Sequence, residues 1–298
     1  MTLGKIPILG VSVTTSSRQD ILSYVKQKLS ATGAAQSIIR IVTPNPEQIV
    51  LAQTNEEFRK VLNEAEIALP DGVGVVWAMK KVSNVSTYQR VKRVNKVADT
   101  FLSRISGVDF MVDLCRVAAE KNKRVLFYGG RNGASRQALV ALKQQIPNLD
   151  GIAEDGAEIS EGCTNDDLRM TNKKNNTVHN SYFVNHNSNE EDSIKHLVQV
   201  IRGRNIQVVF IGLGAPKQEF VISSLRRRLK DPIGKGMVLM SVGGSFDMLA
   251  GNVKRAPKVV QTMGFEWLYR LIQEPWRWRR QLSLLQFFWL VVKQIIIK

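Results

Sequence analysis

The sequence contains few of the residues that bind metals or form covalent cross-links. Its 298 residues include two cysteines, Cys115 and Cys163, and three histidines, which all lie in or beside one polar stretch. Two cysteines make neither a disulfide framework nor a zinc site, and the histidines have no plausible set of further ligands. No Asp-x-Asp motif occurs, so a carboxylate-held Mg²⁺ or Mn²⁺ on a nucleotide diphosphate is not indicated. We therefore expect neither a metal nor another cofactor.

Signatures of several other protein classes are also missing. There is no Gly-x-Gly-x-x-Gly, no Gly-x-x-x-x-Gly-Lys-Ser/Thr and no Gly-x-Ser-x-Gly, so dinucleotide-binding, Walker-type and α/β-hydrolase functions lack their motifs. The first residues, "MTLGKIPILGVSVTTSS", lack the basic region, apolar run and cleavage site of a signal peptide. Together with the scarcity of cysteine, this predicts an intracellular protein.

Positive charge is abundant. The 42 Lys and Arg residues outnumber the 26 Asp and Glu residues, which gives a formal net charge of +16. Such an excess implies an anionic partner, whether nucleic acid, anionic lipid or a phosphorylated substrate. Residues 254–298 hold nine Lys or Arg and two Glu, a net charge of +7, and a second basic run covers residues 88–104.

Short apolar runs alternate with helical patterns along most of the chain. Hydrophobic residues make up 44% of the sequence, enough for a core. The runs typical of strands cover residues 6–13, 37–42, 67–70, 123–130, 205–214 and 235–244. Helical patterns cover residues 18–29, 46–64, 108–122 and 132–146. This alternation predicts an α/β fold with a Rossmann-like, mostly parallel sheet and helices on both faces.

The alternation is interrupted twice and stops near Val253. Residues 83–103 are basic and polar, and residues 160–190 are rich in Asn and nearly free of aliphatic side chains, as in a surface loop. After Val253 only helical patterns remain. We therefore predict a catalytic domain over residues 1–253, with polar insertions at those two places, and a basic helical appendage over residues 254–298.

Small and polar residues follow the predicted strands, in "TPNPE", "PDGVG", "YGGRNG", "GLGAPKQE" and "GGSFD". Ligands of parallel sheets bind beyond the carboxyl ends of the strands, where glycine lets backbone amides approach a phosphate. Gly130 and Gly214 are therefore candidate substrate-binding residues, although a glycine in such a place often serves only a turn. Asp71 is either a general base at this edge or the N-cap of the next helix, and Thr43 and Asn45 leave the same alternatives open.

Seven segments occur in an order that resembles one known family. They are "TPNPEQIVLA", "ALPDGVGVVWA", "SRISGVDFMVDL", "VLFYGG", "VVFIGLGAPKQE", "VGGSFDMLAGNVKRAP" and "GFEWLYRLIQEPWRWRR". The chain resembles the WecG/TagA/CpsF glycosyltransferases. The resemblance implies a UDP-sugar donor, usually of the N-acetylmannosamine type, and a polyprenyl-diphosphate-linked sugar as acceptor. It also implies inversion at the anomeric carbon without a metal, in the synthesis of cell-surface polysaccharide or teichoic acid.

The resemblance also implies roles for individual residues. Asp71 matches the proposed catalytic base. The positions that match substrate-binding residues are Thr43, Asn45, Arg104, Gln218 and Asp247, the last of which would face the nucleotide base. The positions that match arginines expected at a diphosphate are Arg270, Arg277 and Arg280. An inverting transfer needs one base and positive charge where the diphosphate develops, so these residue types fit the reaction.

The C-terminal sequence, "LYRLIQEPWRWRRQLSLLQFFWLVV", combines arginine, tryptophan and long apolar runs. On a helical wheel from Arg279 onward, the polar residues cluster on one side, with Phe287, Leu290 and Ile297 as apolar exceptions on or near the polar stripe. Residues 282–297 are too few to span a bilayer, which needs about 20 apolar residues. We expect a helix that lies in an anionic membrane interface, on the inner face of the cell membrane. The alternative is that these residues pack on the protein's own core or on a partner subunit.

Two other functions are compatible with parts of the sequence. A nucleic-acid-binding protein would use the basic face, but it gives no reason for Asp71 and the motifs at successive strand ends. A nucleotide-sugar epimerase or oxidoreductase would need a nicotinamide site, whose glycine motif is missing. We therefore expect no nucleic acid partner. The sequence does not fix which sugars serve as donor and acceptor, or which polymer is made. It also leaves the oligomeric state open, and a homo-oligomer is one of the states that it allows.

Overall fold

The computed structural model describes residues 2–31, 37–83, 103–156, 188–229, 236–275 and 278–296. For residues 188–190, 262, 279 and 280 it describes the backbone alone. The two predicted polar insertions therefore lie almost entirely outside the described residues.

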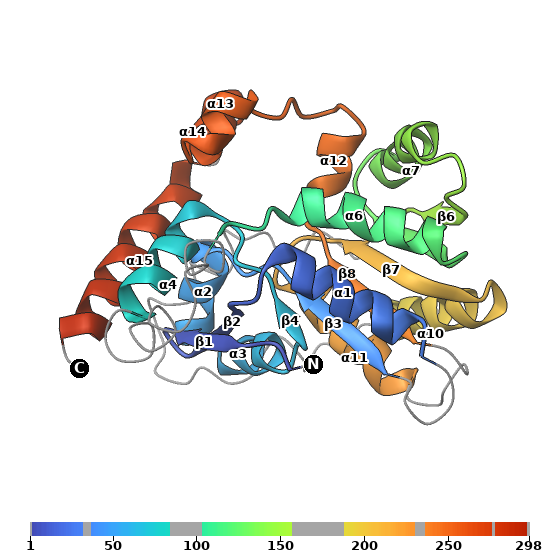
Figure 1. Cartoon of the computed structure of the whole chain (residues 1–298), viewed down its shortest axis with the longest axis horizontal. Helices are drawn as coiled ribbons and strands as arrows, with labels where there is room; N and C mark the ends of the chain where they lie inside the picture. The colour runs from blue at the N-terminus through green and yellow to red at the C-terminus, as the bar shows by residue number, and fades with distance from the viewer. Residues whose placement is uncertain are drawn as a thin grey trace.

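A six-stranded parallel sheet forms the centre of the protein (Figure 1). Its strands are β3 (Ile38–Val42), β4 (Ile67–Ala68), β5 (Arg124–Gly129), β6 (Gly151–Glu154), β7 (Ile206–Gly212) and β8 (Met237–Ser241). The order across the sheet is β4-β3-β8-β7-β5-β6, and every neighbouring pair is parallel. This confirms the predicted Rossmann-like architecture, although β6 has no counterpart among the strands predicted from the sequence.

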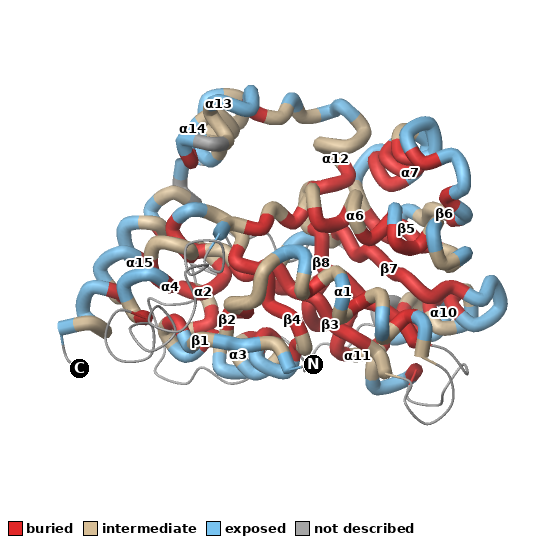
Figure 2. The backbone as a smooth tube through the Cα atoms, viewed as in Figure 1, coloured by how far each residue is buried: buried red, intermediate tan, exposed pale blue. Residues whose placement is uncertain are grey.

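Helices cover both faces of the sheet. Helices α1 (Arg18–Leu29), α6 (Gly107–Glu120) and α7 (Ala134–Gln145) pack on one face, and α10 (Ser188–Gly203) and α11 (Lys217–Arg228) pack on the other. Because side chains alternate along a strand, Phe210 of β7 belongs to the first core and its neighbour Ile211 to the second. Figure 2 shows the strands of this sheet as the most deeply buried part of the chain.

The N-terminal apolar run forms two strands, not the single strand predicted over residues 6–13. Strands β1 (Lys5–Ile8) and β2 (Val11–Thr14) pair antiparallel. The turn between them has Leu9 at φ 48° and Gly10 at φ 79°. Positive φ at both central residues is typical of tight hairpin turns, but leucine there is unusual, so the sequence carries no clear turn signal.

The helix predicted over residues 46–64 is also divided. Helix α2 (Pro46–Thr54) ends where Asn55 begins α3 (Glu56–Asn63). The Asn55 side chain accepts a hydrogen bond from the backbone N–H of Phe58 at 2.8 Å, so it caps the second helix. These helices, the β1–β2 hairpin and α4 (Val73–Ser83) share a further hydrophobic core.

After β8 come helices α12 (Ser245–Leu249), α13 (Lys258–Thr262), α14 (Glu266–Gln273) and α15 (Trp278–Ile296). Helix α15 lies along α2 and α4 (Figure 1). Phe287 and Val291 of α15 are fully buried in the core shared with these helices, and the rings of Phe288 and Trp77 are 4.3 Å apart. One face of α15 therefore packs on the protein itself.

The protein-facing side of α15 overlaps part of the stripe that the helical wheel shows as polar, although Gln286 and Lys293 of that stripe are exposed. Ser283 and Phe287 are buried there, and the side chain of Gln294 accepts a hydrogen bond from the backbone N–H of Leu9 at 3.2 Å. Much of the side that the wheel shows as apolar is exposed, with Leu285 70% exposed and Trp289 61% exposed, whereas Val291 is buried. Among the described residues, no helix is both long and apolar enough to cross a bilayer.

Candidate active site

Several of the loops that carry predicted site residues leave the same edge of the sheet. Because β3, β4, β5, β7 and β8 are parallel, the segments after them meet at their carboxyl ends. Asp71 follows β4, Thr43 follows β3, and Gly214 and Gly243 follow β7 and β8. The topology therefore brings together segments that are up to about 200 residues apart in the chain.

The Asp71 carboxylate lies at the beginning of α6. It accepts hydrogen bonds from the backbone N–H groups of Gly72 and Gly107, and Gly107 is the first residue of that helix. A Cβ atom on Gly107 would lie 3.2 Å from Cγ2 of Thr43 and 3.5 Å from Oδ2 of Asp71, so the three residues are in close contact. Asp71 thus interacts with the positive end of α6 and with Gly72, which precedes the next helix α4.

The pKa of Asp71 is raised above its ordinary value. Burial is the largest cause, since the surrounding protein removes water that would stabilise the charged form. The nearby Arg104 guanidinium lowers the pKa, and the Glu266 carboxylate raises it. The side chain of Asp71 nevertheless remains 33% exposed. The carboxylate is therefore both more basic than a free aspartate and open to a substrate.

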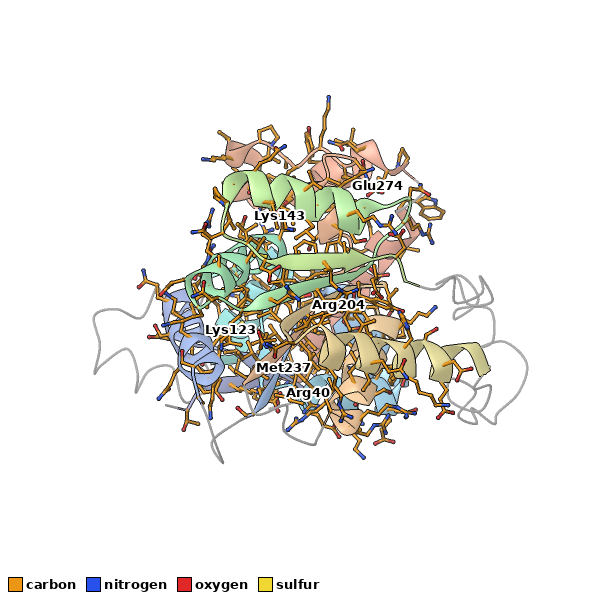
Figure 3. All side chains as sticks on the ribbon, turned by 90° about the vertical axis from the view of Figure 1, so that its right-hand side faces the viewer. Arg40, Lys123, Lys143, Arg204, Met237 and Glu274 are labelled. Carbon is orange, nitrogen blue, oxygen red and sulfur yellow. The ribbon has the colours of Figure 1, made fainter. Side chains whose placement is uncertain are left out.

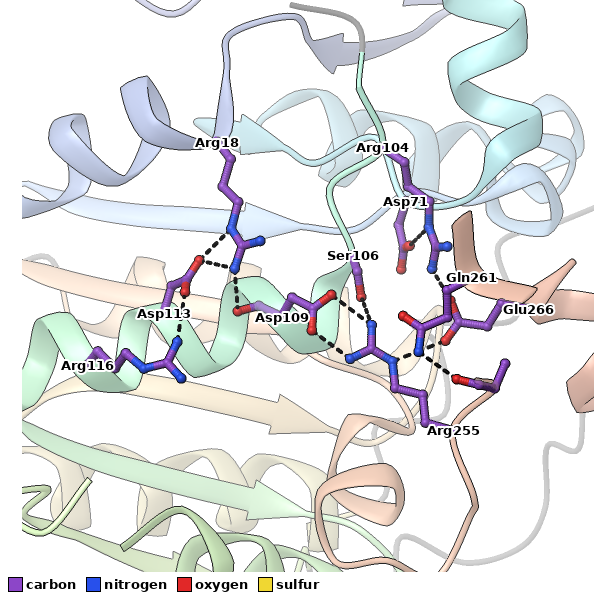
Figure 4. A network of polar contacts seen from close by, with 11 residues as sticks. Arg18, Asp71, Arg104, Ser106, Asp109, Asp113, Arg116, Arg255, Gln261 and Glu266 are labelled. Atoms are coloured by element: carbon purple, nitrogen blue, oxygen red, sulfur yellow. Dashed lines mark hydrogen bonds and ion pairs between the residues drawn. The ribbon is translucent and has the colours of Figure 1, made fainter. Parts of the chain in front are cut away.

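Arg104 stands between two carboxylates (Figure 4). Its Nε atom lies 3.8 Å from Oδ1 of Asp71, and an outer guanidinium nitrogen donates a hydrogen bond to the Glu266 carboxylate. The Nε atom is buried and has no hydrogen-bond partner within the described part of the chain. Arg104 thus connects the residue after β4 to helix α14 of the C-terminal segment.

A second arginine attaches the C-terminal segment to α6. The two outer nitrogens of Arg255 donate to the two carboxylate oxygens of Asp109 at 2.6 and 2.7 Å, a bidentate pair. Arg255 also donates to Ser106 Oγ at 3.3 Å and lies 3.4 Å from the Glu266 carboxylate through Nε. Hydrogen bonding from Arg255 holds the pKa of Asp109 below its ordinary value.

The network of Arg104, Glu266, Arg255 and Asp109 was not predicted from the sequence. Each of these residues lies within a segment that carries the family resemblance, yet only Arg104 matches an expected site position. Arg104 and Glu266 are 162 residues apart and Asp109 and Arg255 are 146 apart. The only available signal was the presence of charged residues inside otherwise apolar motifs, which does not say which pairs meet.

Gln218 is 2% exposed and joins the loops that follow β7 and β8. Its side-chain oxygen accepts a hydrogen bond from the backbone N–H of Gly243 at 3.0 Å, and its amide nitrogen donates to the Glu219 carboxylate at 2.8 Å. Glu219 is fully buried, and burial raises its pKa to about 7. Gln218 therefore holds the shape of this part of the edge.

Arg270 and Asp247 both lie close to Gly244, in the loop after β8. A Cβ atom on Gly244 would lie 3.0 Å from an outer nitrogen of Arg270 and 3.8 Å from Oδ2 of Asp247. Arg270 also donates to the Glu274 carboxylate at 2.8 Å through Nε. At least one of the predicted diphosphate arginines therefore reaches the same edge as Asp71.

Gly130 and Gly214 lie at the ends of β5 and β7 and have φ angles of 82° and 78°. A Cβ atom on Gly214 would meet nothing within 4 Å, so its backbone faces open space, whereas one on Gly130 would lie 3.3 Å from Cβ of Ala134. Positive φ favours glycine at both positions. Of these two glycines, Gly214 is the one that combines that backbone with room for a ligand directly beside it.

Asn45 forms a capping box at the start of α2. Its side chain accepts a hydrogen bond from the backbone N–H of Gln48 at 2.9 Å, and the Gln48 side chain accepts one from the N–H of Asn45 at 3.3 Å. The sequence left open whether Asn45 caps a helix or binds substrate, and this contact is a helix cap. Arg277 lies outside the described residues, as does the side chain of Arg280.

A cavity of about 520 Å³ lies between α3 and α11, away from these residues. None of the predicted site residues lines it, and its walls carry charges of both signs. Figure 3 places Arg40, which lines the cavity, toward the bottom of the molecule, and Glu274, the partner of Arg270, toward the top. Within the described ranges, no group of three or more His, Cys, Asp or Glu side chains could hold a metal ion.

Comparison with known proteins gives consistent matches. The sequence profile of the "Glycosyl transferase WecG/TagA/CpsF family" matches residues 6–158 and 157–298. A Bacillus spizizenii protein named N-acetylglucosaminyldiphosphoundecaprenol N-acetyl-beta-D-mannosaminyltransferase is 31% identical over 253 residues, 85% of this chain and 78% of the relative. A Bacillus subtilis protein of the same name is 28% identical over 98% of this chain and 91% of the relative. The chain therefore belongs to the WecG/TagA/CpsF family of glycosyltransferases.

Proposed function

We propose that this glycosyltransferase moves N-acetylmannosamine from a UDP-sugar donor to an N-acetylglucosamine carried on a polyprenyl diphosphate. The names of the two Bacillus relatives support the transferred sugar and the acceptor. The transfer would serve the synthesis of a cell-surface polysaccharide or teichoic acid. The observation that carries the proposal is the partly exposed Asp71 carboxylate at the carboxyl edge of the sheet, beside Thr43 and Arg104.

Asp71 is the catalytic base in this proposal. Its carboxylate takes the proton from a hydroxyl group of the acceptor sugar while that oxygen attacks the anomeric carbon of the donor. The bond between the anomeric carbon and the diphosphate oxygen breaks, UDP leaves with the electron pair, and the configuration is inverted. A pKa raised by burial makes Asp71 a stronger base than a free aspartate, which favours the proton transfer.

Positive charge stabilises the leaving diphosphate. Arg270 beside Gly244 supplies one guanidinium at the edge, and we assign Arg277 and Arg280 to the same group. Arginine suits this role because its planar, permanently charged group binds phosphate oxygens with two parallel hydrogen bonds. We assign the exposed backbone of Gly214 to a phosphate, and Asp247, which also lies close to Gly244, to the nucleotide base. This arrangement needs no metal.

The remaining predicted residues shape the sugar-binding side. Thr43 contacts the same helix start as Asp71, so its hydroxyl group can bind a sugar hydroxyl next to the base. Asn45 and Gln218 act through the backbone, because Asn45 caps α2 and Gln218 fixes the loop of Gly243. We therefore expect the last two residues to order the pocket for the donor and acceptor more than to touch them.

The C-terminal appendage holds the enzyme on the inner face of the cell membrane. Its exposed apolar side chains include Trp278, Leu282, Leu285, Trp289, Val292 and Ile296. These residues follow one another at steps of three or four and so form one stripe along α15. Each Lys or Arg near an anionic leaflet contributes about 1 kcal/mol, and burial of apolar surface adds roughly 25 cal/mol per Å².

One assay tests the proposal as a whole. The protein is incubated with a panel of UDP-sugars and a short-chain lipid-diphosphate N-acetylglucosamine, and the products are weighed by mass spectrometry. The expected product gains one N-acetylhexosamine, and UDP-N-acetylmannosamine is the donor used. A product with a different sugar would correct the donor, and no transfer from any of the UDP-sugars would contradict the proposed reaction.

A further inference from the structure

We infer that Glu266 is a positioning residue, which draws the Arg104 guanidinium away from Asp71 and so keeps the Asp71 carboxylate basic. The inference rests on the proposed function, because basicity matters only if Asp71 accepts a proton. It assigns to α14 a task beyond membrane binding, since a residue of the C-terminal segment sets the electrostatic environment of the base. Figure 4 shows the three side chains together.

The geometry of Arg104 is the first argument. An arginine that is free to pair with a carboxylate usually forms two short hydrogen bonds, at about 2.7–2.9 Å. Arg104 instead donates to Glu266 and leaves its Nε atom 3.8 Å from Asp71, too far for a hydrogen bond. The buried Nε atom has no hydrogen-bond partner in the described ranges. The pair with Glu266 is thus made at the expense of a full pair with Asp71.

Glu266 is itself held in place. Arg255 lies 3.4 Å from its second carboxylate oxygen, and the bidentate pair with Asp109 fixes the Arg255 guanidinium on α6. Glu266 is only 16% exposed in its side chain, and Arg104 is 23% exposed. Charges in such partly buried positions are screened less by salt than exposed charges. The effect of Glu266 on Asp71 therefore depends on the arrangement in which Arg255 holds the Glu266 carboxylate.

The charges around Asp71 fix the direction of the effect. The groups that act on its carboxylate are Arg104, Glu266 and the backbone N–H groups of Gly72 and Gly107. Neutralising Glu266 removes a negative charge that disfavours ionisation of Asp71, and it also frees Arg104 to pair fully with Asp71. Both changes stabilise the ionised carboxylate, so both make Asp71 a weaker base.

A titration of Asp71 tests this directly. The full-length protein is labelled with ¹³C-aspartate, the Asp71 carboxyl resonance is assigned by its loss in Asp71→Asn, and its midpoint is followed with pH. The expected midpoint of Glu266→Gln lies below that of the wild type. Glu274→Gln is the matched control, because it removes the same charge from the end of the same helix, where the partner is Arg270. The control midpoint should equal that of the wild type.

Kinetics add a second reading. The acidic limb of the pH–rate profile of Glu266→Gln should move to lower pH, and turnover near neutral pH should fall roughly 10-fold because a weaker base transfers the proton more slowly. Glu266→Asp, which keeps the charge but shortens the side chain, should lie between the two. It also serves as the test if Glu266→Gln does not fold.

The outcomes separate the two proposals. Equal Asp71 midpoints in the wild type, Glu266→Gln and Glu266→Asp would overturn the inference about Glu266, whatever the activity. A lowered midpoint, together with full turnover in Asp71→Asn, would support the effect of Glu266 on Asp71 but overturn the proposed role of Asp71 in catalysis.

Discussion

The Nε atom of Arg104 lies 3.8 Å from the Asp71 carboxylate, while the same guanidinium is hydrogen-bonded to Glu266 on the C-terminal helix α14. One side chain thus connects the edge of the parallel sheet to a segment 162 residues later in the chain. The proposed base therefore lies in an electrostatic environment built by both the Rossmann-like core and the C-terminal helices.

The pH dependence of Arg104→Gln should differ in sign from that of Glu266→Gln. Arg104 lowers the pKa of Asp71, so its removal raises that pKa. A base works only when it is deprotonated, and a higher pKa moves the acidic limb of the pH–rate profile to higher pH. The measurement is kcat against pH, with the wild type as reference. An acidic limb that stays in place would show that Arg104 does not act on Asp71.

Substitution of the exposed face of α15 should release the protein from membranes without unfolding it. Leu285 and Trp289 are 70% and 61% exposed, so Leu285→Gln/Trp289→Gln should change the free energy of unfolding by less than about 0.5 kcal/mol per position. Co-sedimentation with vesicles that contain anionic lipid should decrease strongly. The matched control is Val140→Gln, which changes a 59% exposed apolar residue on α7. Unchanged sedimentation of the double variant would contradict the membrane role of this face.

The buried face of α15 should respond in the opposite way. Phe287 is fully buried in the core shared with α2 and α4, so Phe287→Ala should lower the free energy of unfolding by about 3–5 kcal/mol. Urea unfolding of the full-length protein measures this. A loss below about 1 kcal/mol would mean that α15 is not packed on the core in solution. Removal of everything after Val253 would expose this core, so point substitutions are the sharper test.

The buried Glu219 should make stability depend on pH. Its pKa is raised from 4.5 to about 7 by burial, so the folded protein binds the proton more tightly than the unfolded chain. The contribution of this group is fully present below about pH 4.5 and is lost as the pH rises to about 7. Glu219→Gln resembles the protonated acid. In urea unfolding, the variant should therefore lose less free energy of unfolding than the wild type as the pH rises from 5 to 8. An equal loss in both proteins would show that Glu219 does not titrate in this way.

Local signals in the sequence explain why much of the fold could be predicted. Helix α1 has the predicted bounds, Arg18–Leu29, because Ser17 caps it and its apolar residues recur at helical spacing. The parallel sheet follows from alternating strands and helices. The hairpin of β1 and β2 was missed because Leu9 occupies a left-handed turn position that sequence rules assign to Gly, Asn or Asp.

Long-range contacts explain what the sequence could not provide. The pairs of Arg104 with Glu266 and of Arg255 with Asp109 depend on where α14 lies, and no local pattern records that. For α15, the helical wheel shows where polar and apolar residues cluster but not which side packs on the protein. Phe287 lies among polar residues on the wheel, yet it packs on α2 and α4. Position in three dimensions, not residue type, decides which side of such a helix meets solvent.

The rate of sugar transfer by Asp71→Asn tests the central claim most directly. The variant keeps the shape of the side chain but cannot accept a proton, so kcat with UDP-N-acetylmannosamine and the lipid-diphosphate acceptor should fall by about 10² to 10⁴, while binding of the donor persists. A variant that binds the donor and turns over at the wild-type rate would contradict the account.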